Sequence, residues 1–288
     1  MVEIIKLDKK LWPPLFNEIP DPPKELYLKG ALPDFNKLWL TIIGPRRPSQ
    51  QAMVICRQFI DSLAGQEIVI VSGLAIGIDG LAHQVALENN LPTVAIPGSG
   101  LSDRVLYPAR HKLLANKIIS AGGGLLSEYS PETPAAPYTF PRRNRLMAGI
   151  AHKVLVIEAG EKSGTLITAR LGLEYNKDIL VVPGSIFSPL SAGTNRLIKE
   201  GAEPILSADD LKESLGFKNS HNEKSDNKMN LDLSPEEKII KNIIARNNLP
   251  IDEIISKSNL EASQVLMAIS NLEIKKIIAD SGGLFHLL

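Results

Sequence analysis

The feature that most restricts the fold of this chain is a series of short apolar runs, each followed by a glycine-containing turn and then by a stretch with helical spacing. Residues 49–63, 79–89 and 165–175 carry apolar residues three and four positions apart, as crossover helices do. Short buried strands that alternate with helices are typical of parallel βαβ units. The pattern predicts an α/β fold with a doubly wound, mostly parallel sheet. The predicted strands are residues 38–43, 67–71, 93–96, 154–157 and 179–182.

The turns after these strands are the first place to look for a site. In open parallel sheets, ligands bind beyond the carboxyl ends of the strands, where loops lead into helix N-termini whose free N–H groups attract anions. All of the glycine- and serine-containing turns fall on that edge. We therefore expect one site built from several turns that are far apart in the sequence.

The rest of the chain divides into three parts. Residues 1–37 are rich in proline, so we expect this segment to pack on the main domain, residues 38–214, with few regular elements. Residues 215–230 are polar and have too few apolar side chains to fold alone, as in a linker. Residues 231–288 form a small C-terminal domain.

That C-terminal domain has the element order of a winged helix. Ser234 and Glu237 stand in capping-box order around Pro235, which predicts a helix start. Further helices are expected at residues 251–257 and 261–273, and strands at 276–279 and 284–287. The presumed recognition helix, 261–273, contains no lysine or arginine, although helices that read DNA grooves rely on them.

Composition excludes several classes of protein. Cys56 is the single cysteine, so neither an intrachain disulfide nor a zinc cluster built on cysteines can form. The sequence shows no signal peptide and no apolar run of about 18 residues, so we expect a cytoplasmic protein without membrane contact. The 32 basic residues balance the 32 acidic ones. Any field that attracts nucleic acid must therefore be local.

Two of the turns could bind phosphate. In Gly44–Ser49, Ser49 can cap the next helix while Arg46 or Arg47 binds a phosphate through its guanidinium group. In the turn at 72–80, which begins with Ser72 and Gly73, backbone N–H groups could cradle a phosphate. The second turn is not a dinucleotide fingerprint, so no NAD site is predicted. The residues at 79 and 83, at the end of this turn and in the helix after it, are spaced to form a structural pair on one helix face.

Two later stretches add charge and an aromatic ring. Residues 140–145, Phe-Pro-Arg-Arg-Asn-Arg, form the densest basic cluster, in which arginines could neutralise phosphates while Phe140 stacks on an unpaired base. Without its neighbours this cluster could equally be a basic surface loop. Residues 158–168 form a turn into a helix, where Lys162, Ser163 and Thr165 supply a charge and hydroxyl groups. The P-loop pattern is absent, so ATP hydrolysis is not predicted.

In this order, the stretches resemble the signatures of the DprA/Smf family, namely G-S-R-x-x-S, S-G-L-A-x-G-I-D, F-P-x-R-N-R and K-S-G-[ST]-x-x-T-A. Here they are Gly44–Ser49, Ser72–Asp79, Phe140–Arg145 and Lys162–Ala169, and the resemblance covers residues 21–211. Pro45 replaces the serine of the first signature. Tyr107-Pro108 is a further matching stretch.

The resemblance implies an extended Rossmann-like fold that binds single-stranded DNA in a basic pocket, forms a homodimer and helps load the strand-exchange recombinase during natural transformation. It implies no catalytic residue, metal or cofactor. Arg46, Arg143, Arg145 and Lys162 would contact phosphates, and Phe140 and Asn144 would position or stack nucleotides. The full set of predicted DNA-binding residues is Arg46, Arg47, Ser49, Ser72, Gly73, Phe140, Arg143, Asn144, Arg145, Lys162, Ser163, Gly164 and Thr165.

Two other functions fit parts of the sequence. The same kind of sheet serves nucleotide-processing enzymes, for which Glu158 and Asp79 are the acid or base candidates in a suitable place. A regulator acting on duplex DNA through the winged helix is the third reading, and the uncharged recognition helix argues against it.

Overall fold

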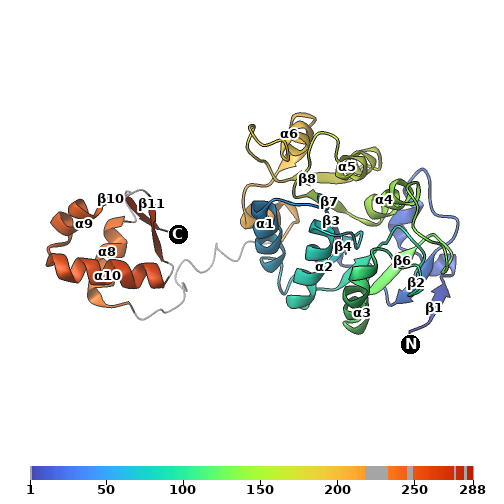
Figure 1. Cartoon of the computed structure of the whole chain (residues 1–288), viewed down its shortest axis with the longest axis horizontal. Helices are drawn as coiled ribbons and strands as arrows, with labels where there is room; N and C mark the ends of the chain where they lie inside the picture. The colour runs from blue at the N-terminus through green and yellow to red at the C-terminus, as the bar shows by residue number, and fades with distance from the viewer. Residues whose placement is uncertain (1, 218–232, 245–248, 276, 282–283, 288) are drawn as a thin grey trace. The chain divides into compact units, whose positions relative to one another are not determined.

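The computed structural model of the chain describes residues 2–217, 233–244, 249–275, 277–281 and 284–287. The chain divides into two units, Met1–Asn219 and Ser220–Leu288 (Figure 1). The predicted linker at 215–230 lies mostly outside the described residues, so its character and the exact domain limits stay predictions.

The first unit is built on one large twisted sheet. Seven adjacent strands pair in parallel, and two strands from the N-terminal segment extend one edge in antiparallel fashion. The predicted doubly wound, mostly parallel sheet is therefore confirmed, as are its five predicted strands to within a residue or two. In spatial order, the strands of the described part are β1 (Ile4–Lys6), β2 (Tyr27–Gly30), β6 (Gly124–Ser127), β5 (Thr93–Ala95), β4 (Ile68–Ser72), β3 (Leu38–Ile43), β7 (Lys153–Val156), β8 (Asp178–Val181) and β9 (Glu203–Pro204).

The order of the strands creates a switch point beside β3. From β3 the chain first builds β4, β5 and β6 on one side, and it then returns to place β7, β8 and β9 on the other side. The loops after β3 and β7 consequently leave the same sheet edge in diverging directions. In open α/β sheets, such a divergence opens a crevice for a ligand.

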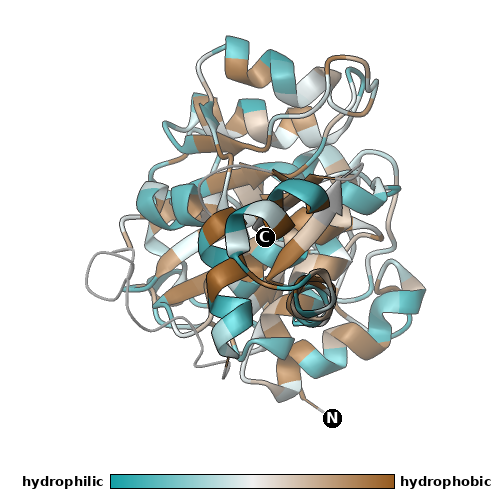
Figure 2. Cartoon of the chain, turned by 90° about the vertical axis from the view of Figure 1, so that its left-hand side faces the viewer, coloured by the Kyte–Doolittle hydropathy of each residue, from teal (hydrophilic) through white to brown (hydrophobic). Residues whose placement is uncertain are grey.

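Helices cover both faces of this sheet because successive strand residues point to opposite sides. In β3, Leu40 and Ile42 pack with α1 and α2, whereas Trp39 and Ile43 face the core under α4 and α5. Hydrophobic and hydrophilic residues are mixed along the helices in Figure 2, as expected of helices with one buried face. These helices are α1 (Gln50–Asp61), α2 (Ile78–Glu88), α3 (Lys112–Ser120), α4 (Thr139–Ile150), α5 (Thr165–Glu174), α6 (Ala192–Lys199) and α7 (Ala208–Ser214).

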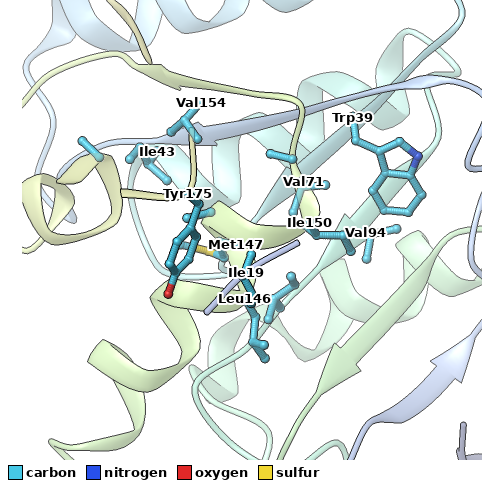
Figure 3. Close-up of a cluster of buried hydrophobic side chains, with 14 of the residues drawn as sticks. Ile19, Trp39, Ile43, Val71, Val94, Leu146, Met147, Ile150, Val154 and Tyr175 are labelled. Carbon is cyan, nitrogen blue, oxygen red and sulfur yellow. The ribbon is translucent and has the colours of Figure 1, made fainter. Parts of the chain in front are cut away.

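The core beneath α4 fixes this helix against the strands. Leu146, Met147 and Ile150 lie among strand side chains such as Ile43 and Val71 (Figure 3). The hydroxyl of Thr41 also donates to the backbone carbonyl of Met147 at 2.7 Å. The residues that precede Leu146 on α4 are thereby held at the carboxyl edge of the sheet.

The expectation of few regular elements in residues 1–37 was wrong in part. The segment contributes β1 and β2 to the sheet, together with short 3₁₀ helices at Lys9–Leu11 and Pro14–Asn17. Its prolines lie outside the two strands, where no N–H is required for the ladder. Phe16, Leu26 and Leu28 are buried in the main core. The apolar residues between the prolines are therefore what packs this segment into the core.

A buried histidine on α2 makes the first unit sensitive to acid. His83 is fully buried, and its Nδ1 lies 2.7 Å from the Thr93 hydroxyl. The expected pairing of Asp79 with His83 is therefore replaced by a contact between α2 and β5. Burial is the largest cause that lowers the pKa of His83, to about 3. The ring thus stays neutral in the folded protein.

We expect the free energy of unfolding to fall below pH 6.5 because of His83. Because the pKa of His83 is lower in the folded than in the unfolded chain, its contribution to the free energy of unfolding is complete above the unfolded pKa of about 6.5. This contribution is lost as the pH falls. At pH 5 the loss should be about 2 kcal/mol relative to pH 7.5. Urea unfolding of the unaltered chain and of His83→Gln at both pH values tests this. Equal pH dependence in the two proteins would contradict it.

The second unit has the elements that the sequence predicts. Helices α8 (Pro235–Ile244), α9 (Ile251–Ser258) and α10 (Ala262–Ile274) precede the hairpin strands β11 (Ile278–Ser281) and β12 (Leu284–Leu287), and β10 (Leu249–Pro250) pairs with β12. The capping box is present, since the Ser234 N–H donates to Glu237 at 2.9 Å and the Glu237 N–H donates to the Ser234 hydroxyl at 3.2 Å. The winged-helix assignment itself stays a prediction.

Candidate functional site

A cavity of about 400 Å³ opens at the switch point of the large sheet. It lies where the chain leaves β3 and β7, between the start of α4 and the start of α5. All four predicted stretches contribute to its wall directly, the second of them through Ala75 and Asp79. The lining includes Gly44, Pro45, Arg46, Phe140, Arg143, Asn144, Ser163, Gly164 and Thr165.

The turn after β3 is held by a carboxylate from the neighbouring strand end. Glu158 is only 7% exposed and accepts from the Ser49 N–H at 2.9 Å and from the Ser49 hydroxyl at 2.7 Å. The same Ser49 hydroxyl accepts from the Ala52 N–H at 3.0 Å and so caps α1, as predicted. With Ser49 fixed at its end, the turn exposes Arg46 and Arg47 to solvent. Ser49 is therefore a positioning residue for these arginines.

Arg46 and Phe140 form a cation and ring pair at the cavity. The Arg46 guanidinium carbon lies 5.0 Å from the centre of the Phe140 ring, which is a cation–π distance. The turn after β5 makes room for the ring, because a Cβ on Gly98 would lie 2.6 Å from a Phe140 carbon. Phe140 is half-buried, so part of the residue remains open to solvent.

The basic cluster at 140–145 is a helix and not a loop. Residues 139–150 form α4, and Pro141 is tolerated because it lies in the first turn, where N–H groups have no partner within the helix. The helical period separates the three arginines onto different sides. The possible reading as a basic surface loop is therefore wrong.

Arg143 points inward and joins two strand ends. It is 5% exposed, and its Nη1 donates to the Gly73 carbonyl at 2.6 Å and also to the Ile96 carbonyl. Burial lowers the pKa of Arg143 and raises that of Asp79, against the attraction between their charges. Asn144 accepts from Arg143 at 3.1 Å through its side-chain oxygen. Arg143 thus forms part of the cavity wall while its donors hold the backbone.

The start of the turn after β4 is also buried and held by hydrogen bonds. Ser72 is fully buried and donates to the Ile42 carbonyl at 2.7 Å. Gly73 is also buried, and a Cβ at this position would lie 2.3 Å from the Arg143 Nη1. Neither residue lines the cavity in the described structure. The structure gives both a role in packing under the site.

The turn after β7 supplies the opposite wall. Ser163, Gly164 and Thr165 line the cavity, and the Thr165 N–H donates to the Ser163 hydroxyl at 3.2 Å. Helix α5 begins at Thr165 and has no acidic residue in its first turn, so its N-terminus can attract an anion. Lys162 is exposed just outside the lining.

Arg145 lies elsewhere. Its side chain is 7% exposed and forms an ion pair with Glu128, whose side chain is equally buried. It also donates to the Asp21 carbonyl at 2.8 Å and lies 3.2 Å from the Asp21 carboxylate. Arg145 is absent from the cavity lining. Arg145 ties α4 to the N-terminal segment, and its assignment to a DNA phosphate stays a prediction.

Two residues of the site were not predicted. Tyr107 makes an edge-on contact with Phe140, with ring centres 5.6 Å apart. Together with Arg110 and Arg46 it lines an adjoining space of about 270 Å³. The Tyr107-Pro108 stretch, which matches the family pattern, was the available signal. It could not reveal that these residues lie beside Phe140, because the contact spans 33 positions of sequence.

The groups that an enzyme would use are committed to structural contacts. Glu158 accepts two hydrogen bonds from Ser49, and Asp79, although it lines the cavity, is 6% exposed and lies near the charge of Arg143. Burial raises the pKa of Cys56 to about 12, which keeps this thiol protonated. Within the described residues, no group of His, Cys, Asp and Glu is arranged to hold a metal ion. No helix in that part of the chain could cross a bilayer.

Comparison with known sequences gives one family. Residues 3–216 match the profile of the family described as DNA recombination-mediator protein A. The chain is 38% identical to the protein Smf of Escherichia coli over 214 residues, which cover 74% of this chain and 57% of that protein. It is 35% identical to the DNA processing protein DprA of Bacillus subtilis over 76% of this chain and 73% of that protein.

Solved structures agree with these matches. The DNA processing protein A of Streptococcus pneumoniae superposes with a TM-score of 0.67 at 35% identity, over 76% of this chain and 75% of that one. The corresponding protein of Helicobacter pylori, whose structure concerns its single-stranded DNA binding mode, gives a TM-score of 0.65 at 31% identity. That match covers 74% of this chain and 96% of the Helicobacter chain.

Proposed function

This chain belongs to the DNA recombination-mediator protein A family, and from that membership we propose that it binds single-stranded DNA at the switch-point cavity. The observation that carries the proposal is the exposed guanidinium of Arg46 over the face of Phe140 at that cavity. A cation for phosphate beside a ring for a base is the combination that single-strand binding uses. The Helicobacter pylori relative, whose structure concerns its single-stranded DNA binding mode, supports this choice of ligand.

The proposed DNA contacts are assigned from the solvent exposure of the side chains. Arg46, Arg47 and Lys162 are exposed cations that, in the described part of the chain, form no ion pair, and we assign them to phosphates. Phe140 stacks on a base, and Tyr107 and Arg110 receive the neighbouring nucleotide. Asn144, Ser163, Gly164 and Thr165 supply polar contacts inside the cavity. Ser49, Ser72, Gly73, Arg143 and Arg145 support the site from beneath or beside it.

The proposal extends to the cellular role. Bound single-stranded DNA is protected and passed to a strand-exchange recombinase during natural transformation and DNA recombination, in the cytoplasm, by a homodimer of this chain. These features rest on family membership. Base specificity is weak, because phosphate contacts and stacking carry little sequence information. The protein acts without a catalytic residue.

We expect Arg46→Ala to weaken binding of oligo-dT by about 10- to 100-fold, since a charged hydrogen bond to phosphate is lost. The slope of log affinity against log salt should fall by about one phosphate contact. Fluorescence anisotropy over a salt series measures both quantities. Lys37→Ala is the matched control, because Lys37 pairs with Glu67 at the opposite, amino end of the sheet.

The same titration decides between the alternatives. Tight, salt-sensitive binding of oligo-dT with weak binding of the matching duplex supports the proposal. Preference for the duplex would instead favour a regulator that acts through the second unit. Absence of binding to both would leave the nucleotide-processing enzyme, and an unchanged affinity in Arg46→Ala would refute the site.

A further inference from the structure

The loop between β8 and α6 exposes an unusual group of apolar side chains. Phe187 is 91% exposed, Ile186 is 84% exposed and Leu190 is 39% exposed. Contiguous exposed apolar side chains in a folded protein mark a place of contact. An aromatic ring this exposed gains nothing from the core of its own chain. A ligand or partner is the remaining source of stabilisation.

The loop is held in a defined shape. The Phe187 N–H donates to the Ser185 hydroxyl at 3.2 Å, and the Ser188 N–H donates to the Ser185 carbonyl at 3.0 Å. At its base, the Asn195 side chain donates to the Gly184 carbonyl at 2.9 Å and accepts from the Gly184 N–H at 3.1 Å. A preformed loop loses little conformational entropy when it binds.

This loop adjoins the turn that forms one wall of the cavity. The Gly193 N–H, just beyond the loop, donates to the Ala159 carbonyl at 2.8 Å. A Cβ on Gly160 would lie 3.1 Å from the carbonyl oxygen of Pro189. Lys162 is exposed in the same turn, and Ser163 lines the cavity. The carboxyl edge of the sheet therefore runs from the cavity past Lys162 to the loop.

The chemistry of the loop favours a base over a charged group. Residues 184–191 carry no charge, and Glu161 is exposed beside Lys162, so the local charges balance. Ile186 and Phe187 are adjacent, and Ser188 and Pro189 separate them from Leu190, so Phe187 is the single ring of a short apolar stretch. A lone exposed ring next to a phosphate-binding edge is suited to stacking on an unpaired base.

We propose that Phe187 is a second stacking platform, for a base of the single strand that leaves the cavity past Lys162. The proposal rests on the single-stranded DNA binding proposed above and adds a binding position to it. Because the platform is uncharged, its contribution is independent of salt. It also requires a strand long enough to reach beyond the cavity.

The experiment compares the unaltered chain with Phe187→Ala on oligo-dT of increasing length, from about 4 to about 20 nucleotides. We expect equal affinities for the shortest strands and an affinity about 5- to 100-fold lower for the longest ones in the variant. The salt slope should be unchanged, in contrast to Arg46→Ala. Phe187→Trp should restore binding, and its added fluorescence should be quenched by the DNA. Leu11→Ala is the control, because Leu11 is 60% exposed and belongs to the segment that forms the far edge of the sheet.

The outcomes separate the two proposals. If the unaltered chain binds no strand of any length, single-stranded DNA binding itself is refuted. If the unaltered chain binds and Phe187→Ala binds equally at every length, only the stacking platform is refuted. A variant that changes from dimer to monomer in sedimentation, with equal losses at all lengths, would assign the loop to a second copy of the chain and overturn the inference.

Discussion

Replacing Arg143 with alanine is expected to lower the free energy of unfolding by about 3–5 kcal/mol. The Arg143 guanidinium bonds the Gly73 and Ile96 carbonyls and lies near the buried Asp79. Its removal would leave two backbone acceptors without their donor and a carboxyl without its compensating charge. Unfolding in urea, followed by circular dichroism, measures the loss.

Arg142→Ala is the matched control for this prediction. Arg142 precedes Arg143 on α4, but its side chain is 57% exposed and its Nε lies 4.0 Å from Glu128. Replacement of an exposed side chain should change stability by at most about 0.5 kcal/mol. A similar small effect for Arg143→Ala would show that the carbonyls find other donors. The DNA salt slope of Arg143→Ala then tells whether this arginine also contacts phosphate: the slope stays the same for a purely positioning residue.

Arg145→Ala is expected to cost about 3 kcal/mol of stability and to leave the DNA salt slope unchanged. The Arg145 side chain is 7% exposed and pairs with a Glu128 side chain of equal burial. Truncation would leave that carboxylate without its main partner, and only the more distant Arg142 would remain nearby. The N-terminal segment would also lose its contact through Asp21.

A double-mutant cycle isolates the pair. Arg145→Ala with Glu128→Ala should be less destabilising than the sum of the single variants, because the double variant leaves no unpaired charge. Additive losses would mean that the two residues act independently. If the slope of log affinity against log salt falls by about one in Arg145→Ala, Arg145 does contact a DNA phosphate.

The local patterns in the sequence were sufficient for the architecture. Apolar runs such as residues 38–43 became buried strands because both faces of a parallel sheet are covered. The Ser234 and Glu237 capping box formed as predicted because such contacts involve neighbours in the chain. The two N-terminal strands were missed, since β2 pairs with β6, about a hundred residues away, and β1 pairs with β2.

The sequence located the candidate site, but only the tertiary structure showed which of its polar residues are exposed and which are buried in structural contacts. Chain order placed the signature turns at one sheet edge, because the carboxyl ends of parallel strands coincide. Three arginines within four positions looked equivalent in the sequence, but on α4 they point in different directions. Arg142 is exposed to solvent, Arg143 donates to the Gly73 carbonyl, and Arg145 forms an ion pair with Glu128.

The sequence by itself thus determined the type of sheet and the edge that carries the site, because strand burial, turn chemistry and helix capping are local properties. Tertiary structure alone decided which polar groups stay free to bind a ligand. A polar group is either exposed or bound by a partner that can lie far away in the chain, as Glu158 is by Ser49 in the turn that carries Arg46. Such partners follow from the packing of distant segments, which no local pattern encodes.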